Sequence, residues 1–134
     1  MAAAALETVP LRSEQDIVLA RKLVRTVTQE LGFSLVDQTK IITAASELAR
    51  NALIHGKGGE MVCEKMQDGG RNGIRLTFSD KGPGIADLGL ALTDGWTTGG
   101  GLGLGLSGSK RLVHDFDIQS APGKGTTVTI ARWR

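Results

Sequence analysis

The chain has 134 residues, the size of one domain, and 40% of them are hydrophobic, which is enough to form one core. Its formal net charge is only +2, aromatic residues make up 4% and tyrosine is absent, so we expect no nucleic acid among its partners. No apolar run of about 18 residues occurs, and we therefore expect no membrane-spanning helix and no membrane partner.

The beginning of the chain, MAAAALETVP, has no basic segment ahead of its short alanine run, which argues against a secretory signal. We expect residues 1–11 to be a flexible tail on a single domain that spans residues 1–134. The single Cys63 cannot form an internal disulfide, and this favours the reducing environment of the cytoplasm.

Two amphipathic helices are predicted in the first half of the chain. The tetrapeptide SEQD, which starts at Ser13, resembles a capping box, and Gly32 supplies a stop. A second helix is predicted from near Ser34, again with an aspartate three residues on, to His55 and Gly56. Apolar residues recur at helical spacing in both segments: Ile17, Ala20, Val24, Val27 and Leu31 in the first, and Ile41, Ala45, Leu48 and Ala52 in the second.

Two hairpins are predicted in the second half. GEMVCEKMQ and IRLTFSD are expected strands joined by the turn DGGRNG, and FDIQSA and TTVTIARW are expected strands joined by PGKG. Between the hairpins lie KGPGI, a glycine-rich run and a helix predicted over about residues 104–114. This order predicts an α+β fold, a two-layer sandwich of one antiparallel (mixed) sheet with the helices on a single face.

The second helix carries a polar pair, Glu47 and Asn51, in SELARNALIHG. Residues four apart project from the same face of a helix. A glutamate can orient or deprotonate a nucleophile, and an asparagine offers a neutral oxygen that suits magnesium. Taken alone, the pair is explained better by an exposed polar face of an amphipathic helix, because such pairs are common on exposed helix faces.

The segment DKGPG follows the predicted strand that ends at Asp80. Side chains alternate along a strand, so Asp80 shares a face with Leu76 and Phe78 and lies at the edge of the core, where a carboxylate needs a strong donor. The exocyclic amine of adenine is such a donor, and Gly82 and Gly84 would let the backbone approach a flat ring. A tight turn after a strand is the alternative interpretation.

The glycine-rich run TTGGGLGLGLS holds five glycines in the seven residues from Gly99. It fits neither a P-loop nor a dinucleotide-binding fingerprint. The run suits a mobile lid that leads into a helix whose first amides face phosphate, and a floppy connector is the alternative. In GKGTTVTI, a hairpin turn alone explains Gly125 and Thr126.

In this order and spacing, the four features resemble the GHKL family of ATP-binding domains, which includes gyrase, Hsp90, MutL and histidine kinases. The resemblance covers the chain from about residue 12 to the end. The matching positions are the N-box (Glu47, Asn51), the first glycine box (Asp80, Gly82, Gly84), the second glycine box (Gly101, Gly103, Gly105) and the terminal Gly125-Thr126.

Longer stretches look like the RsbT-type switch kinases of bacterial stressosome partner-switching modules: ITAASELARNALIHGKGG, DKGPGIADLGLALTDGWTTGGGLGLGLSGSKRL and GKGTTVTIARW. That family phosphorylates serine or threonine in STAS-domain antagonist and scaffold proteins. When released from these, it binds and activates a PP2C-type phosphatase. His55 is familiar from the related anti-sigma factors, which sequester a sigma factor and phosphorylate an anti-anti-sigma factor. The alternative interpretation is that this chain is such an anti-sigma factor.

The resemblance implies ATP and Mg²⁺ as cofactors and assigns roles to individual residues. Asn51 holds the magnesium ion, Glu47 is the catalytic base or orients the attacking hydroxyl, and Asp80 reads adenine. The remaining positions implied to contact nucleotide are Gly82, Gly84, Ile85, Gly101, Leu102, Gly103, Leu104, Gly105, and Thr126 or Thr127 through a water. Arg50, Lys57 and Lys110 are candidates for phosphate contacts, with solvated surface charge as the alternative for each.

Overall fold

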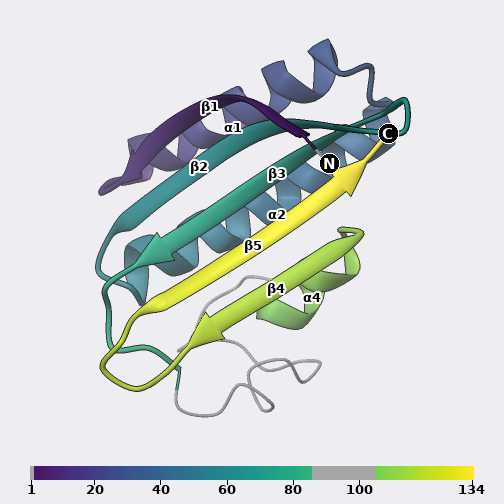
Figure 1. The fold of residues 1–134 in the computed structure, drawn as a ribbon. Coiled ribbons are helices and arrows are strands. Elements are labelled where there is room, and N and C mark those ends of the chain that lie inside the picture. Colours follow the sequence, from purple (N-terminus) through teal and green to yellow (C-terminus); the bar gives the residue numbers. More distant parts are fainter. Residues whose placement is uncertain (1, 86–104) are drawn as a thin grey trace.

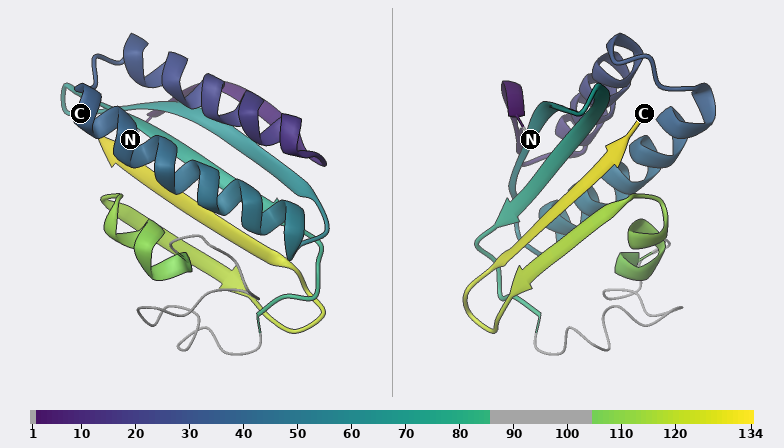
Figure 2. Two further views of the ribbon diagram at one scale, coloured as in Figure 1. Left: turned by 180° about the vertical axis from the view of Figure 1, so that it is seen from behind. Right: turned by 45° about the vertical axis from the view of Figure 1, so that its right-hand side comes forward.

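The computed structural model describes residues 2–85 and 105–134, with side chains from residue 6 on. Along the chain its elements are β1 (Ala2–Leu11), α1 (Glu14–Glu30), α2 (Leu35–Ile54), β2 (Gly59–Asp68), β3 (Arg71–Asp80), α4 (Gly105–Arg111), β4 (Asp115–Ser120) and β5 (Thr126–Trp133). The strands form one sheet in the order β1-β2-β3-β5-β4, with every pair antiparallel. Figures 1 and 2 show these helices on one face of the sheet, so the predicted α+β sandwich is confirmed.

Both long helices begin where their capping residues predict. The Ser13 hydroxyl accepts a hydrogen bond from the Asp16 amide at 3.3 Å, and the Ser34 hydroxyl accepts one from the Asp37 amide at 3.1 Å. These bonds satisfy amides that have no partner within the first turn of a helix. Gly32 follows α1 with φ +79°, a left-handed conformation that suits glycine.

The core lies between the helices and one face of the sheet. From β3 it takes Ile74, Leu76 and Phe78, each at most 2% exposed, as their alternation predicts. The predicted stripes of α1 and α2 are buried against them, apart from Leu31, which is half-buried. Burial raises the pKa of the Cys63 thiol to about 12, so this cysteine is a small core residue.

The expectation of a flexible tail over residues 1–11 was wrong for the described part. Residues 2–11 form the edge strand β1, which pairs with β2 from Ala2 opposite Gln67 to Leu11 opposite Gly59. Leu11 is fully buried and Val9 packs against the core, and this burial fixes the segment on the sheet.

Two smaller boundaries also differ. Of the helix predicted over about residues 104–114, residues 105–111 form α4, which ends earlier than predicted, at Arg111. The first hairpin turn is tighter than DGGRNG, because β2 and β3 pair as far as Asp68 opposite Arg71 and leave only Gly69 and Gly70 between them. Within the described ranges, no helix is long and apolar enough to cross a membrane.

Candidate functional site

Helix α2 presents Glu47 and Asn51 on one face, as their spacing predicts. Its buried residues, among them Leu48 and Ala52, turn the apolar side of the helix to the sheet and leave Glu47 and Asn51 half-buried at the border of the core. The Asn51 carbonyl accepts hydrogen bonds from the amides of His55 and Gly56, at 2.9 and 3.1 Å, where the helix ends. The turn that leads from α2 to β2 therefore begins directly after the helical turn that holds Asn51.

Glu47 contacts the start of α4. Its Oε1 accepts a hydrogen bond from the Gly105 amide at 3.2 Å, across 58 residues of sequence. Gly105 has φ +69° and is buried, and the neighbouring Leu106 is 2% exposed in the core. The carboxylate that the sequence singles out thus holds Gly105, the first residue of α4.

Asp80 ends β3 beside the C-terminal end of α2. Its Oδ1 accepts a hydrogen bond from the Gly82 amide at 2.9 Å. A Cβ at Gly56 would lie 2.3 Å from the Asp80 Cγ, and a Cβ at Gly82 would lie 2.6 Å from the Gly56 Cα. Glycine at both positions therefore lets α2, the carboxylate and the following loop meet in close contact.

The register of β5 separates the two candidate threonines. Asp80 pairs with Thr126, and Ser79 pairs with Thr127. Paired residues of an antiparallel sheet share a face and neighbours alternate, so Thr126 lies on the helix-covered face with Asp80 and Thr127 faces the other side. The structure brings Thr126 to the site and does not bring Thr127 there.

The loop after Asp80 interlocks with the turn between β4 and β5. A Cβ at Gly84 would lie 2.0 Å from the Ala121 carbonyl oxygen, and a Cβ at Gly125 would lie 2.2 Å from the Asp80 carbonyl oxygen. Both glycines also have positive φ, +78° and +73°. The Gly123 amide donates to the Pro83 carbonyl at 2.7 Å, so the two segments pack together along one edge of the site.

The other predicted positions are only partly brought to this edge. Ile85 is half-buried and packs against the core, whereas Gly101, Leu102, Gly103 and Leu104 lie outside the described residues. Arg50 is engaged with Glu14 of α1 in an exposed ion pair at 3.0 Å, which weakens its case as a phosphate ligand. Lys57 and Lys110 are exposed, the first in the turn that follows α2.

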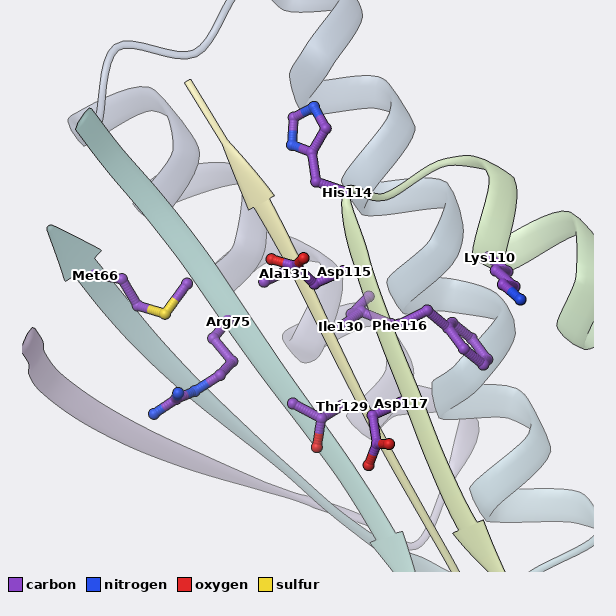
Figure 3. A pocket seen from close by; sticks show the side chains of 10 residues that line it. All are labelled: Met66, Arg75, Lys110, His114, Asp115, Phe116, Asp117, Thr129, Ile130 and Ala131. Carbon is purple, nitrogen blue, oxygen red and sulfur yellow. The ribbon is translucent and has the colours of Figure 1, made fainter. Parts of the chain in front are cut away.

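A pocket of about 550 Å³ lies at a different place, along β4 and β5 (Figure 3). Its charged lining residues are Arg75, Lys110, Asp115 and Asp117, and it shares no residue with the Glu47, Asn51 and Asp80 site. Figure 3 shows that side chains from both sides of β4 line this pocket. Because β4 is an edge strand of the sheet, the pocket is a depression in the surface along that edge.

The site's residues fit a magnesium nucleotide. Within the described ranges no three His, Cys, Asp or Glu side chains gather into a metal-binding group. Magnesium commonly binds through one or two protein oxygens, substrate phosphates and waters, and does not need a protein cage. The Asn51 amide oxygen has the chemistry of such a ligand, and Asn51 lies one helical turn from Glu47 and just before the helix end that meets Asp80.

Sequence reasoning missed two residues of the site. It took Gly56 as a helix stop, yet Gly56 does not have positive φ, so its close contact with Asp80 is the reason for glycine there. Ser120 links the loop at Ile85 to Thr126, and no local pattern distinguishes a serine at the end of a strand. Both roles depend on contacts between distant segments.

Comparisons with known proteins identify the family of the chain. The family model of histidine kinase-, DNA gyrase B- and HSP90-like ATPases matches residues 36–134. The chain belongs to this ATPase family. It is 45% identical over 125 residues to the serine/threonine-protein kinase RsbT of Bacillus subtilis, covering 93% of this chain and 94% of that protein. It is thus an RsbT-type serine/threonine kinase with an ATP-binding domain.

More distant relatives share the fold. The anti-sigma F factor of Bacillus licheniformis is 30% identical over 126 residues, covering 88% of this chain and 84% of that protein. A structure of the RsbU and RsbW domains of a Mycobacterium tuberculosis protein aligns with a TM-score of 0.65 at 21% identity, over 98% of this chain and 33% of that one. A histidine kinase domain from Erythrobacter litoralis aligns with a TM-score of 0.52 at 21% identity, over 98% of this chain and 65% of that one.

Proposed function

We propose that this kinase uses magnesium-bound ATP to phosphorylate STAS-domain antagonist and scaffold proteins of a bacterial partner-switching pathway. When it is released from them, it binds and activates a PP2C-type phosphatase. The observation that carries the nucleotide part is the contact of Asp80 with Gly56 and Gly82, one turn beyond Asn51. The likeness to RsbT supports the kinase and partner part.

Each residue of the site has a distinct role in the proposal. The Asp80 carboxylate accepts a hydrogen bond from the adenine amine, while Thr126 assists from the paired strand. The Asn51 amide oxygen holds magnesium, which when bound neutralises phosphate charge. Gly101 to Gly105, with Leu102 and Leu104, wrap the phosphates, and Ile85 packs beside the base.

Glu47 is the proposed base or orienting group for the hydroxyl of the protein substrate. Phosphoryl transfer depends mainly on positioning and charge neutralisation, so one carboxylate and one metal ion are sufficient. Because Glu47 also holds the Gly105 amide, it links the reacting end of the nucleotide site to the segment that would cover the phosphates.

An anti-sigma factor with kinase activity on an anti-anti-sigma factor is the second candidate. The observation in its favour is the 29–30% identity to anti-sigma F factors over nearly the whole chain. The two candidates share the proposed nucleotide chemistry and differ in the protein that they bind between phosphorylation events.

A capture experiment with labelled ATP tests the proposal. The purified kinase is incubated with magnesium and γ-labelled ATP, in turn with a STAS-domain antagonist, a PP2C-type phosphatase and a sigma factor. We expect label on the STAS protein and stable binding to the phosphatase alone. Binding to the sigma factor in place of the phosphatase would favour the second candidate, and no labelling of any STAS protein would contradict both.

A further inference from the structure

Ser120 lies where β4 ends, and its hydroxyl contacts three groups of the site. The Ile85 amide donates to Ser120 Oγ at 2.8 Å, and Ser120 Oγ donates to the Gly125 carbonyl at 2.9 Å. Thr126 Oγ1 lies 2.8 Å from the same oxygen. One side chain thus joins the loop after Asp80, the turn before β5 and the threonine that faces the site.

The chemistry of these groups fixes the direction of each hydrogen bond. A hydroxyl has one proton to donate and two lone pairs that accept. The Gly125 carbonyl can only accept, so it takes the Ser120 proton, and the Ile85 amide can only donate. The Thr126 hydroxyl must then donate its own proton to Ser120, which leaves Thr126 Oγ1 only as an acceptor toward the site.

This direction matters because Thr126 pairs directly with Asp80 on the same face of the sheet. Asp80 is an acceptor when ionised, so two acceptors face a bound base from adjacent strands. A purine with a 6-amino group offers them a donor, directly or through a water. A purine with a 6-oxo group offers another acceptor, and a buried acceptor that faces an acceptor is unfavourable.

We propose that Ser120 is a positioning residue that holds the Thr126 hydroxyl as a hydrogen-bond acceptor and so makes the site prefer a 6-amino purine over a 6-oxo purine. The inference rests on the proposed nucleotide site. In the absence of the Ser120 oxygen, the Thr126 hydroxyl is free to rotate and donate its proton to a 6-oxo group. Selectivity falls even though Asp80 remains.

The rest of the edge is also held by contacts that do not involve the Ser120 hydroxyl. The Gly123 amide donates to the Pro83 carbonyl, and Gly84 packs on Ala121. Ser120→Ala is therefore expected to fold. Thr28→Val is the matched control, since it also deletes a hydroxyl that donates to backbone carbonyls, at Val24 and Arg25 within α1.

Calorimetric titration with ADP and with inosine diphosphate, which differ at position 6 of the purine, tests the inference. We expect the wild type to prefer ADP by about tenfold or more. Ser120→Ala is expected to reduce that ratio by at least about threefold, because the loss of one oriented acceptor is a modest effect. Ser120→Thr, which keeps the hydroxyl, and Thr28→Val are expected to retain the wild-type ratio.

The outcomes separate this inference from the proposed function. A wild type that binds neither diphosphate overturns both. A wild type that prefers ADP, together with an unchanged ratio in Ser120→Ala, overturns only the role of Ser120. If Ser120→Ala does not fold, Thr126→Val removes the acceptor itself and is expected to lower the ratio in the same way, and an unchanged ratio there overturns the inference.

Discussion

At the scale of single residues, the site depends on glycines whose missing side chains permit contact between distant segments. Gly56 lies against the Asp80 carboxylate, and Gly125 lies against the Asp80 carbonyl. The two differ in backbone conformation, because Gly125 has positive φ and Gly56 does not. Alanine at Gly56 therefore introduces a steric conflict with one side chain and no strain in its own φ.

We predict that Gly56→Ala lowers ADP affinity by at least about tenfold, because the added methyl group displaces the Asp80 carboxylate. We also predict that it lowers the free energy of unfolding by about 1–3 kcal/mol. Calorimetric titration and thermal unfolding measure the two effects. Gly69→Ala is the control: its φ is +58° and no atom lies within 4 Å of its added Cβ. Gly69→Ala is expected to lose about 1 kcal/mol of stability and no ADP affinity. Equal ADP affinities in the wild type, Gly56→Ala and Gly69→Ala would remove Asp80 from the nucleotide site.

At the scale of elements, capping residues and apolar periodicity were sufficient to predict where α1 and α2 begin and where the four later strands lie. Ser13 and Ser34 act within four residues of sequence, which is why local patterns identify them. The strand β1 could not be predicted, because its alanines carry no alternation of apolar and polar residues. Its order comes from pairing with β2, whose paired residues lie 48 to 65 positions further along the chain.

The same limit applies to the site. Glu47, Asn51 and Asp80 could be chosen from spacing and chemistry. The structure places the end of α2, which carries Glu47 and Asn51, against Asp80 at the end of β3. The choice between Thr126 and Thr127 could not be made, because it depends on the register between β3 and β5. Ser120 was missed because its partners come from three separate segments.

For β1 we predict that Leu11→Ala destabilises the protein by about 2–5 kcal/mol, the usual effect of truncating a fully buried leucine. Leu6→Ala, in the same strand but 65% exposed, is expected to change stability by less than about 0.5 kcal/mol. Urea unfolding followed by circular dichroism gives both values. Equal and small effects would show that β1 does not contribute to the folded core.

At the scale of the whole molecule, Arg132 of β5 connects the sheet to the helical layer. Its guanidinium donates to the Asp37 carboxylate of α2 at 2.7 Å and to the Leu112 carbonyl beyond α4 at 2.9 Å. The hydrogen bond from Arg132 holds the pKa of Asp37 below its ordinary value of 3.8, with smaller contributions from Ser34 and Lys40. Ionised Asp37 therefore favours the folded state.

The pKa of Asp37 is lower in the folded protein than in the unfolded chain. The Asp37 carboxylate therefore contributes fully to folding stability above the unfolded pKa of 3.8, and this contribution is lost as the pH falls through the pKa of the folded protein. We predict that Asp37→Asn lowers stability at neutral pH and that the difference from wild type shrinks as the pH falls below 3.8. Urea unfolding at a series of pH values measures this. Asp68→Asn, at the exposed end of β2, is the control, and a difference independent of pH for Asp37→Asn would contradict the ion pair.

The central claim for the whole molecule is that Glu47 serves phosphate transfer from a nucleotide held by Asn51 and Asp80. Glutamine at position 47 keeps an oxygen that can accept from the Gly105 amide, so α4 should stay in place while the basic oxygen is lost. Glu30→Gln makes the same change at an exposed glutamate of α1, paired with Lys65, and controls for loss of charge.

The most direct measurement is single-turnover transfer of label from γ-labelled ATP to a purified STAS-domain antagonist, with ATP affinity measured in parallel. Glu47→Gln is expected to transfer phosphate about 10²–10⁴-fold more slowly at nearly unchanged ATP affinity, the usual size of general acid–base assistance. A fall nearer to about tenfold would assign Glu47 to orientation, as a loose transition state allows. Transfer at the wild-type rate by Glu47→Gln would contradict the claim.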